Sequence, residues 1–237
     1  MRIFRTICFF ILPSVLLRIF FPSKMSRGSK IGFSWICAED IRLGQDVIIG
    51  HFNFIKTKTF YVSGGGKIKH FNIIRGLFDF NIMDKAWIHS FNKISSRVGT
   101  AEQYHTPKFV LGKGAAIMVH HIFDVTDDII IGDNTLIAGS GSQFYTHSFC
   151  MTKEGCYRVD GTISLGKSNY IGTNSIVCAG IKTVDFVTIG ANTTVTKDLD
   201  QSGLWVSSQL RHINIIDNNP HEKFIESGIE NIFRKIK

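Results

Sequence analysis

The feature that most constrains the fold of this chain is an aliphatic residue that recurs every six positions. A first series runs through Ile31, Cys37, Leu43, Ile49 and Ile55. The same spacing returns further along the chain at Ile82, Ile88, Ile94, Leu111, Ile117, Ile131, Ile137, Leu165, Ile171, Val177, Ile189 and Val195. A helix repeats its apolar face every three or four residues and a strand every two, so neither explains a period of six. The period fits a coil with three flat sides, each a short strand that points one aliphatic side chain inward. The sequence therefore predicts an all-β parallel β-helix.

Glycine supports this prediction, because it directly follows several of the aliphatic positions, as at Gly32, Gly44 and Gly50. We expect these glycines at the corners of the coil, where bulky side chains disfavour the backbone conformation. The β-helix domain should span residues 28–212. The pattern is weakest between residues 56 and 80, where we expect an irregular coil.

Four units carry a resemblance to a known family: IGDNTL (131–136), LGKSNY (165–170), IGTNSI (171–176) and IGANTT (189–194). They resemble the repeats of the hexapeptide-repeat acyltransferases. The resemblance implies a left-handed coil, although parallel crossovers are usually right-handed. It also implies a homotrimer that uses an acyl-CoA.

Three segments fall outside the repeat. Residues 1–27 begin with an apolar stretch that contains Arg2, Arg5 and Arg18 and is too short and too interrupted to span a bilayer. We expect a helical segment, packed on the main domain or another subunit or lying on the inner face of the cytoplasmic membrane. Residues 147–164 are expected to form a projecting loop that reaches toward a neighbouring subunit. Residues 213–237 should contain an amphipathic helix over 217–236.

Charge and cysteine content narrow the class of protein. The formal charge of +8 favours polyanionic partners. No Arg-rich run concentrates the charge, so we do not expect nucleic acid to bind. The five cysteines include no CxxC pair, which argues against a disulfide framework or a zinc cage and favours the cytoplasm.

The best catalytic candidate is His147, in the segment FYTHSF that ends two repeat units. Acyl transfer to a hydroxyl needs a base that works near neutral pH, and histidine is suited to this. In the resembling family, a histidine at the start of a loop does this work. The pattern H-x-F-D-x-T from His121 resembles a subgroup that acetylates sugars. It implies an acceptor-binding or assisting role for His121 and an orienting role for Asp124.

The resemblance also implies an acetyl-CoA site in the later coils. The pantetheine arm needs small residues, and the phosphates need cations. The N–H groups of Gly139–Gly141 are candidates to stabilise the thioester oxyanion, with Ser140 and Ser142 as alternatives. The expected cofactor-binding residues are Ser140, Ala179, Gly180, Ala191, Thr196, Lys197, Trp205 and Arg211. Family members that bind zinc use a histidine pair spaced H-x4-H, which this chain lacks, so we expect no metal.

These observations predict an acetyl-CoA-dependent O-acetyltransferase that acts on a sugar hydroxyl by direct transfer, with a surface polysaccharide or lipid-linked glycan as acceptor. Two alternatives remain open. One is N-acetylation of an amino sugar or nucleotide-sugar, which uses the same machinery. The other is a β-helix that only scaffolds an assembly.

Overall fold

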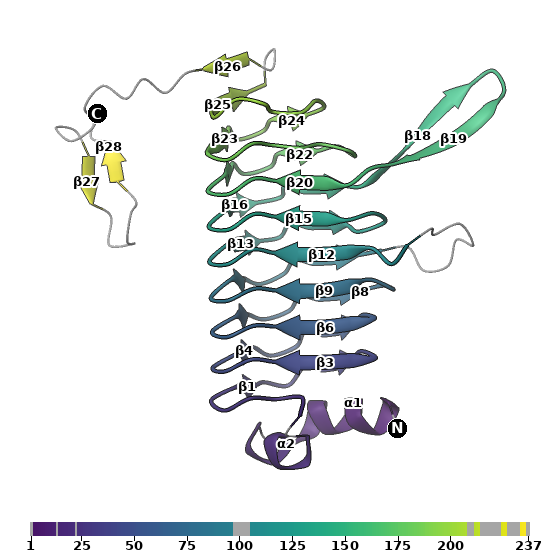
Figure 1. Ribbon diagram of the computed structural model, residues 1–237, viewed down its shortest axis with the longest axis vertical. Helices are drawn as coiled ribbons and strands as arrows, with labels where there is room; N and C mark the ends of the chain where they lie inside the picture. Colours follow the sequence, from purple (N-terminus) through teal and green to yellow (C-terminus); the bar gives the residue numbers. More distant parts are fainter. Residues whose placement is uncertain are drawn as a thin grey trace.

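The chain winds into a tall coil of parallel strands, as the computed structural model shows (Figure 1). The structure describes residues 2–12, 14–21, 23–96, 105–207, 211–213, 224–226 and 233–235. With the N-terminal coils at the bottom of Figure 1, the front strands run toward the left as the chain rises. The fold is thus the left-handed parallel β-helix that the repeats predicted.

Most coils contribute one short strand to each of three faces, and the last coils contribute none to the third. Face 1 contains β1 (Lys30–Ile31), β4 (Ile48–Ile49), β7 (Lys67–Ile68), β10 (Trp87–Ile88), β13 (Ala116–Val119), β16 (Leu136–Ser140), β21 (Tyr170–Ile171), β23 (Val187–Ile189), β25 (Gly203–Val206) and the antiparallel β26 (Arg211–Ile213). Face 2 contains β2 (Trp35–Cys37), β5 (Phe54–Lys56), β8 (Ile73–Arg75), β11 (Lys93–Ser95), β14 (Ile122–Asp124), β17 (Gln143–Tyr145), β22 (Ile176–Val177) and β24 (Thr194–Val195). Face 3 contains β3 (Asp40–Leu43), β6 (Thr59–Val62), β9 (Asp79–Ile82), β12 (Lys108–Leu111), β15 (Ile129–Ile131) and β20 (Ile163–Leu165). The chain passes through corner 1–2 between faces 1 and 2, then corner 2–3, then corner 3–1.

The core is a set of columns in which each inward side chain stacks on its equivalent in the next coil. Faces 1 and 2 contribute mainly isoleucine and valine, which are buried except for the partly buried Ile31 in the first coil. Face 3 and the middle of face 2 contribute a phenylalanine column, and its ring centroids lie 4.6–5.6 Å apart. These rings belong to Phe60, Phe80, Phe109, Phe123 and Phe144. Burying such a side chain stabilises a fold by about 1.5–3 kcal/mol, so the columns hold the coils in register.

The glycines of the repeat serve close packing rather than turn geometry, which corrects the expectation from sequence. A Cβ on Gly132 would lie 2.4 Å from the carbonyl oxygen of Gly166 in the next coil, and Gly132 has no positive φ. The left-handed backbone conformation falls elsewhere in the corners, at residues such as Asp46, Phe52 and Asn134. The hexad glycine is therefore needed because neighbouring coils approach closely.

The early coils are more regular than predicted. Strands β5 to β9 continue the three faces without a break through residues 56–80, where an irregular coil was expected. The inward residue of β2 is Ile36 rather than Cys37, which is half-buried on the outside of the coil. The hexad position thus shifts by one residue in this strand, because strand side chains alternate between inside and outside.

The segment 147–164 projects from corner 2–3 as predicted, but it is a hairpin rather than an irregular loop (Figure 1). Its antiparallel strands are β18 (His147–Thr152) and β19 (Gly155–Asp160). The hairpin exposes Phe149, Met151, Tyr157 and Val159.

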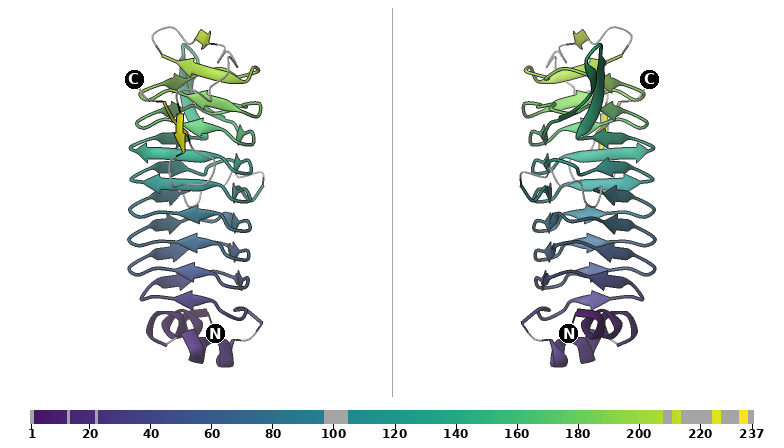
Figure 2. Two further views of the ribbon diagram at one scale, coloured as in Figure 1. Left: turned by 90° about the vertical axis from the view of Figure 1, so that its left-hand side faces the viewer. Right: turned by 90° about the vertical axis from the view of Figure 1, so that its right-hand side faces the viewer.

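Helices α1 (Arg2–Ile11) and α2 (Ser14–Phe20) lie at the N-terminal end of the coil, within the segment predicted to be helical (Figure 2). No helix among the described residues is both long and apolar enough to cross a membrane. The C-terminal helix predicted over 217–236 is not found in the two described parts of that range. These are strands β27 (Phe224–Glu226) and β28 (Phe233–Lys235), which pair antiparallel, and strands favour their aromatic and β-branched residues. The rest of the range lies outside the described residues.

Candidate functional site at corner 2–3

Two neighbouring strands of face 2 bring together the two side chains that the sequence singled out for chemistry. Strands β14 and β17 pair in parallel, so that Asp124 lies beside Tyr145. His147 follows two residues later as the first residue of the hairpin. The His147 ring therefore rises over the end of β14, next to the carboxylate of Asp124.

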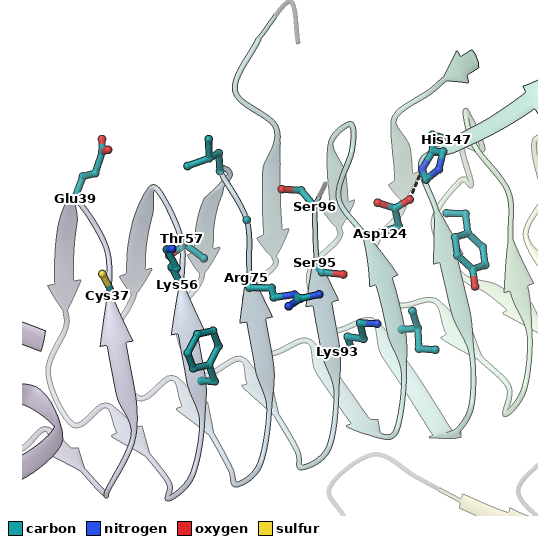
Figure 3. Close-up of a pocket in the computed structure, with 15 residues that line it drawn as sticks. Cys37, Glu39, Lys56, Thr57, Arg75, Lys93, Ser95, Ser96, Asp124 and His147 are labelled. Atoms are coloured by element: carbon teal, nitrogen blue, oxygen red, sulfur yellow. Dashed lines mark ion pairs between the residues drawn. The ribbon is translucent and has the colours of Figure 1, made fainter. Parts of the chain in front are cut away.

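His147 and Asp124 form an ion pair in which Nδ1 of the imidazole faces Oδ2 of the carboxylate (Figure 3). Only 18% of the His147 side chain and 14% of the Asp124 side chain are exposed. The other carboxylate oxygen, Oδ1, accepts a hydrogen bond of 2.8 Å from Thr126 Oγ1. The ring of Phe149 packs edge-on against the imidazole, with ring centroids 5.7 Å apart. Both carboxylate oxygens of Asp124 thus have a partner: Thr126 contacts Oδ1, and the imidazole of His147 contacts Oδ2.

This arrangement suits a general base. A carboxylate on Nδ1 fixes the imidazole tautomer, leaves Nε2 free to accept a proton and stabilises the imidazolium that forms. The predicted orienting contact of Asp124 is therefore present in the structure.

His147 lies at one end of a groove of about 770 Å³ that runs along face 2 toward the N-terminal coils (Figure 3). Outward-facing side chains from six neighbouring strands, β2 to β17, form its floor, and residues of corner 2–3 form its rim. The lining residues that bear charge are Glu39, Lys56, Arg75, Lys93, Asp124 and His147. The groove is open along its length, so an extended molecule can lie in it with one end at His147.

Sequence reasoning missed the three cations of this groove. Lys56 and Arg75 are register partners on β5 and β8, and Lys93 lies on the next strand. The signal was available for Lys56 and Arg75, because residues 19 or 20 positions apart occupy equivalent places in successive coils. Lys93 does not follow this spacing, since the register partner of Arg75 on β11 is Ser95. The signal was overlooked because these positions face outward and carry no hexad residue.

His121 lies in a different environment, which corrects its predicted role. It is fully buried and belongs to an interior polar ladder at corner 1–2, in which each side chain accepts a hydrogen bond from a main-chain N–H of the next coil. The ladder runs through Ser34, Asn53, Asn72, Asn92, His121, Ser142 and Ser175. In this ladder His121 Nδ1 accepts from the N–H of Ser142 at 3.1 Å. A side chain with no exposed surface cannot contact an acceptor in the groove, so the structure supports a structural role for His121.

The surroundings of His121 also disfavour its charged form. Burial lowers the pKa of His121 to about 4 from the ordinary value of 6.5, and main-chain groups of Gly139 and Ser142 oppose this only in part. Protonation would also remove the lone pair with which Nδ1 accepts its hydrogen bond. His121 therefore acts as a neutral acceptor, in the same way as Asn92 in the coil before it and Ser142 in the coil after it.

Four of the residues predicted to bind cofactor lie at the same corner as His147, in the coils that follow it. Ala179 and Gly180 come directly after β22, and Thr196 and Lys197 come directly after β24. Gly180 donates a hydrogen bond to the carbonyl oxygen of Gly161, and Gly161 donates to Thr146, next to His147. A Cβ on Gly161 would lie 2.6 Å from the nitrogen of Gly180. The edge beside His147 is thus a strip of nearly bare backbone, which a narrow chain can approach closely.

Ser140 and Ala191 lie at corner 1–2, at the opposite end of face 2 from His147. Within one chain, these residues and His147 therefore cannot line one site. The predicted oxyanion donors share this location, and two of their N–H groups are already used. Ser140 N donates to Thr173 Oγ1 at 3.0 Å, and Gly141 N donates to the carbonyl oxygen of His120 at 3.2 Å. They would meet His147 only across an interface between two copies of the chain.

Trp205 and Arg211 are placed less favourably for the predicted cofactor contacts. Trp205 is 4% exposed and packs into the top of the hydrophobic core. Its Nε1 donates to the carbonyl oxygen of Gln201 at 3.0 Å, and Lys197 Nζ lies 5.7 Å from the centre of its ring. A buried indole cannot stack on the adenine of CoA. This corrects the prediction that Trp205 binds the cofactor. Arg211 lies on β26, and its side chain is outside the described part of the structure.

Comparison of the sequence with models of known protein families gives no match, and comparison with curated proteins gives none either. Solved structures resemble the chain in fold. A maltose O-acetyltransferase from Clostridium difficile 630 is 24% identical over 57% of this chain, with a TM-score of 0.44. The match spans 65% of that enzyme's length. A galactoside acetyltransferase in complex with coenzyme A is 17% identical over 67% of this chain and 73% of its own, with a TM-score of 0.48. A polysialic acid O-acetyltransferase is 12% identical over 81% of both chains, with a TM-score of 0.48.

Proposed function

We propose that this chain is an acetyl-CoA-dependent O-acetyltransferase that acts on a sugar hydroxyl, with His147 as general base. The observation that carries the proposal is the His147–Asp124 pair at the mouth of a long groove. The groove offers room for a glycan, and the glycine strip at Gly161 and Gly180 offers an approach for a pantetheine arm.

The reaction would proceed by direct transfer. Nε2 of His147 takes the proton of the sugar hydroxyl as its oxygen attacks the thioester carbon. The tetrahedral intermediate then collapses, the carbon–sulfur bond breaks, and the CoA sulfur leaves with the proton from the imidazolium. Asp124 holds the ring through Nδ1 and stabilises its positive charge between the two proton transfers.

Assembly into a homotrimer is part of the proposal. Corner 1–2 exposes Phe52, Phe71 and Phe91, whose rings stack at centroid distances of 5.2 and 5.1 Å. The hairpin exposes a further apolar surface at Phe149 and Met151. A second copy of the chain would cover both surfaces. It would also bring Ser140 and Ala191 of corner 1–2 toward the His147 of a neighbour, so that the predicted cofactor residues form one site.

We further propose that the N-terminal helices contact the cytoplasmic membrane peripherally. They expose Phe4, Ile19 and Phe20, each at least 64% accessible. An apolar surface of this kind can be buried at the boundary between headgroups and acyl chains. Flotation with anionic liposomes tests this: the full chain should float, and a Phe4→Ser/Ile19→Ser/Phe20→Ser variant should stay at the bottom. Equal behaviour of the two proteins would contradict the membrane contact.

The experiment that tests the activity is release of the CoA thiol. Acetyl-CoA is added to the protein with a panel of glycans, and free thiol is measured over time, together with the melting temperature at rising acetyl-CoA. The proposal predicts acceptor-dependent thiol release and stabilisation by acetyl-CoA. A protein that shows neither is a scaffold, and the proposal fails.

A further inference from the structure

The groove beside His147 has a composition that selects one class of acceptor. Three of its lining residues are cations: Lys56, Arg75 and Lys93. Of the described residues, two carboxylates line it: Glu39, at the far end, and Asp124, which already pairs with His147. Among the described residues, no carboxylate lies within ion-pair distance of any of the three cations. Within the part of the chain that the structure describes, the groove thus carries three cations without a carboxylate partner.

The cations form a staggered row rather than a cluster. Lys56 and Arg75 are register partners, and Lys93 lies two residues before Ser95, the register partner of Arg75. They lie on the consecutive strands β5, β8 and β11, and the same sheet continues through β14 and β17 to the reactive end. Neighbouring strands lie about 4.8 Å apart, so the row and the reactive end together extend over about 19 Å. Figure 3 shows the side chains of Arg75 and Lys93 over this sheet, between Lys56 and the His147–Asp124 pair. A single sugar would fill only part of this length.

Apolar groups accompany the charges. Phe54 and Leu77 line the same groove and are 41% and 51% exposed. Sites that bind sugars combine such apolar surfaces with a few placed polar groups. Arginine is also the cation whose planar fork matches a carboxylate at two points. A mixed row of this kind suits a chain of sugars that bear carboxylates.

We propose that the acceptor is an acidic polysaccharide, which lies along face 2 with its carboxylates on Lys56, Arg75 and Lys93 and one hydroxyl at His147. This inference rests on the proposed acetyl transfer and names its substrate class. It also assigns a direction, because the glycan extends from the reactive residue toward the N-terminal coils.

The test compares acids with their neutral counterparts. The probes are tetramers of galacturonic acid and of sialic acid, together with the same tetramers after reduction of their carboxyl groups. Binding is measured by calorimetry in the presence of CoA, for the wild-type chain and for a Lys56→Gln/Arg75→Gln/Lys93→Gln variant. A matched control, Lys67→Gln/Lys69→Gln/Lys85→Gln, removes the same charge from a basic surface on face 1 and the adjoining corner 3–1.

The proposal predicts that at least one acidic tetramer binds the wild type about tenfold more tightly than its reduced form, as expected for several exposed ion pairs. The groove variant should lose this preference and the control variant should keep it. The proposal is overturned if neither acid binds more tightly than its reduced form, or if the control variant loses the preference as well. Thiol release by the wild-type chain with a neutral acceptor would leave the proposed acetyl transfer standing after such a result.

Discussion

His121 and His147 lie at opposite ends of face 2, on neighbouring coils, and they serve opposite purposes. His121, at corner 1–2, is enclosed in the polar ladder and is kept neutral by burial. His147, at corner 2–3, is partly exposed, lies against a carboxylate and opens onto the groove. The same side chain is therefore a structural acceptor at one corner and a candidate base at the other. The surroundings, rather than the residue type, decide which histidine can do chemistry.

Removing each imidazole in turn tests most directly whether the two histidines have these different roles. His147→Ala should lower the rate of CoA release by about a hundred- to ten-thousand-fold, because a positioned base contributes about that much. The variant should still fold, because the buried columns rather than this side chain stabilise the coil. His121→Asn should keep most of the activity, because asparagine serves the same ladder one coil away. Steady-state thiol release on both variants checks this, and the opposite ranking would refute the assignment.

The second prediction uses the pKa of His121, which the fold lowers to about 4 from 6.5. The unfolded chain binds this proton more readily, so the stabilisation is fully present above pH 6.5 and is lost as the pH falls toward 4. A shift of this size corresponds to about 3 kcal/mol at most.

Urea unfolding of the wild type and of His121→Asn across this pH range measures the effect as a difference. The wild type should lose about 3 kcal/mol more than the variant between pH 6.5 and pH 4. Parallel pH profiles for the two proteins would show that His121 is not held neutral.

A smaller effect is expected from Asp124→Asn. The amide can still touch Nδ1 but cannot stabilise an imidazolium, so CoA release should fall by about ten- to a hundredfold, less than on loss of the base itself. The loss should be largely in kcat, and the KM for acetyl-CoA should stay near that of the wild type. A variant that is as fast as the wild type would leave the ion pair without a catalytic role.

The smallest effect is expected from a substitution at corner 1–2, which tests the proposed contact between copies of the chain. Phe71 is exposed and holds a positive φ of 58°, a conformation that asparagine tolerates well. Phe71→Asn should therefore leave the coil folded while it weakens contacts between copies at corner 1–2. Light scattering during gel filtration should show a trimer for the wild type and a lower mass for the variant at equal concentration. A monomeric wild-type chain would contradict the proposed assembly.

The period of six was enough to predict the coil, since stacked aliphatic columns are the main source of its stability. It did not show that the hexad glycines serve close approach between coils, because that depends on how tightly the coils stack. The polar ladder at corner 1–2 has a sequence pattern that could have predicted it. A polar residue stands two positions before an inward apolar residue, as in Asn72 before Ile74 and His121 before Phe123. This pattern was missed because histidine was considered for its chemistry alone.

The candidate site was predicted in part. An orienting role for Asp124 was implied by the resemblance of the H-x-F-D-x-T pattern, and the structure places Asp124 in contact with His147. The division of the predicted cofactor residues between two corners could not be seen from the sequence, because it depends on where each turn falls in the coil. The basic groove depends on how outward-facing residues align across coils. The period of six describes only the inward-facing residues, so it could not predict this groove.

The central claim is that corner 2–3 is the reactive corner, and a crystal structure with bound CoA tests it most directly. We predict that the CoA thiol lies within hydrogen-bond reach of His147 Nε2, about 3–4 Å away, beside Gly161 and Gly180. We further predict that Ser140 and Ala191 from a neighbouring copy line the other side of the cofactor. A thiol bound away from His147 would contradict the claim.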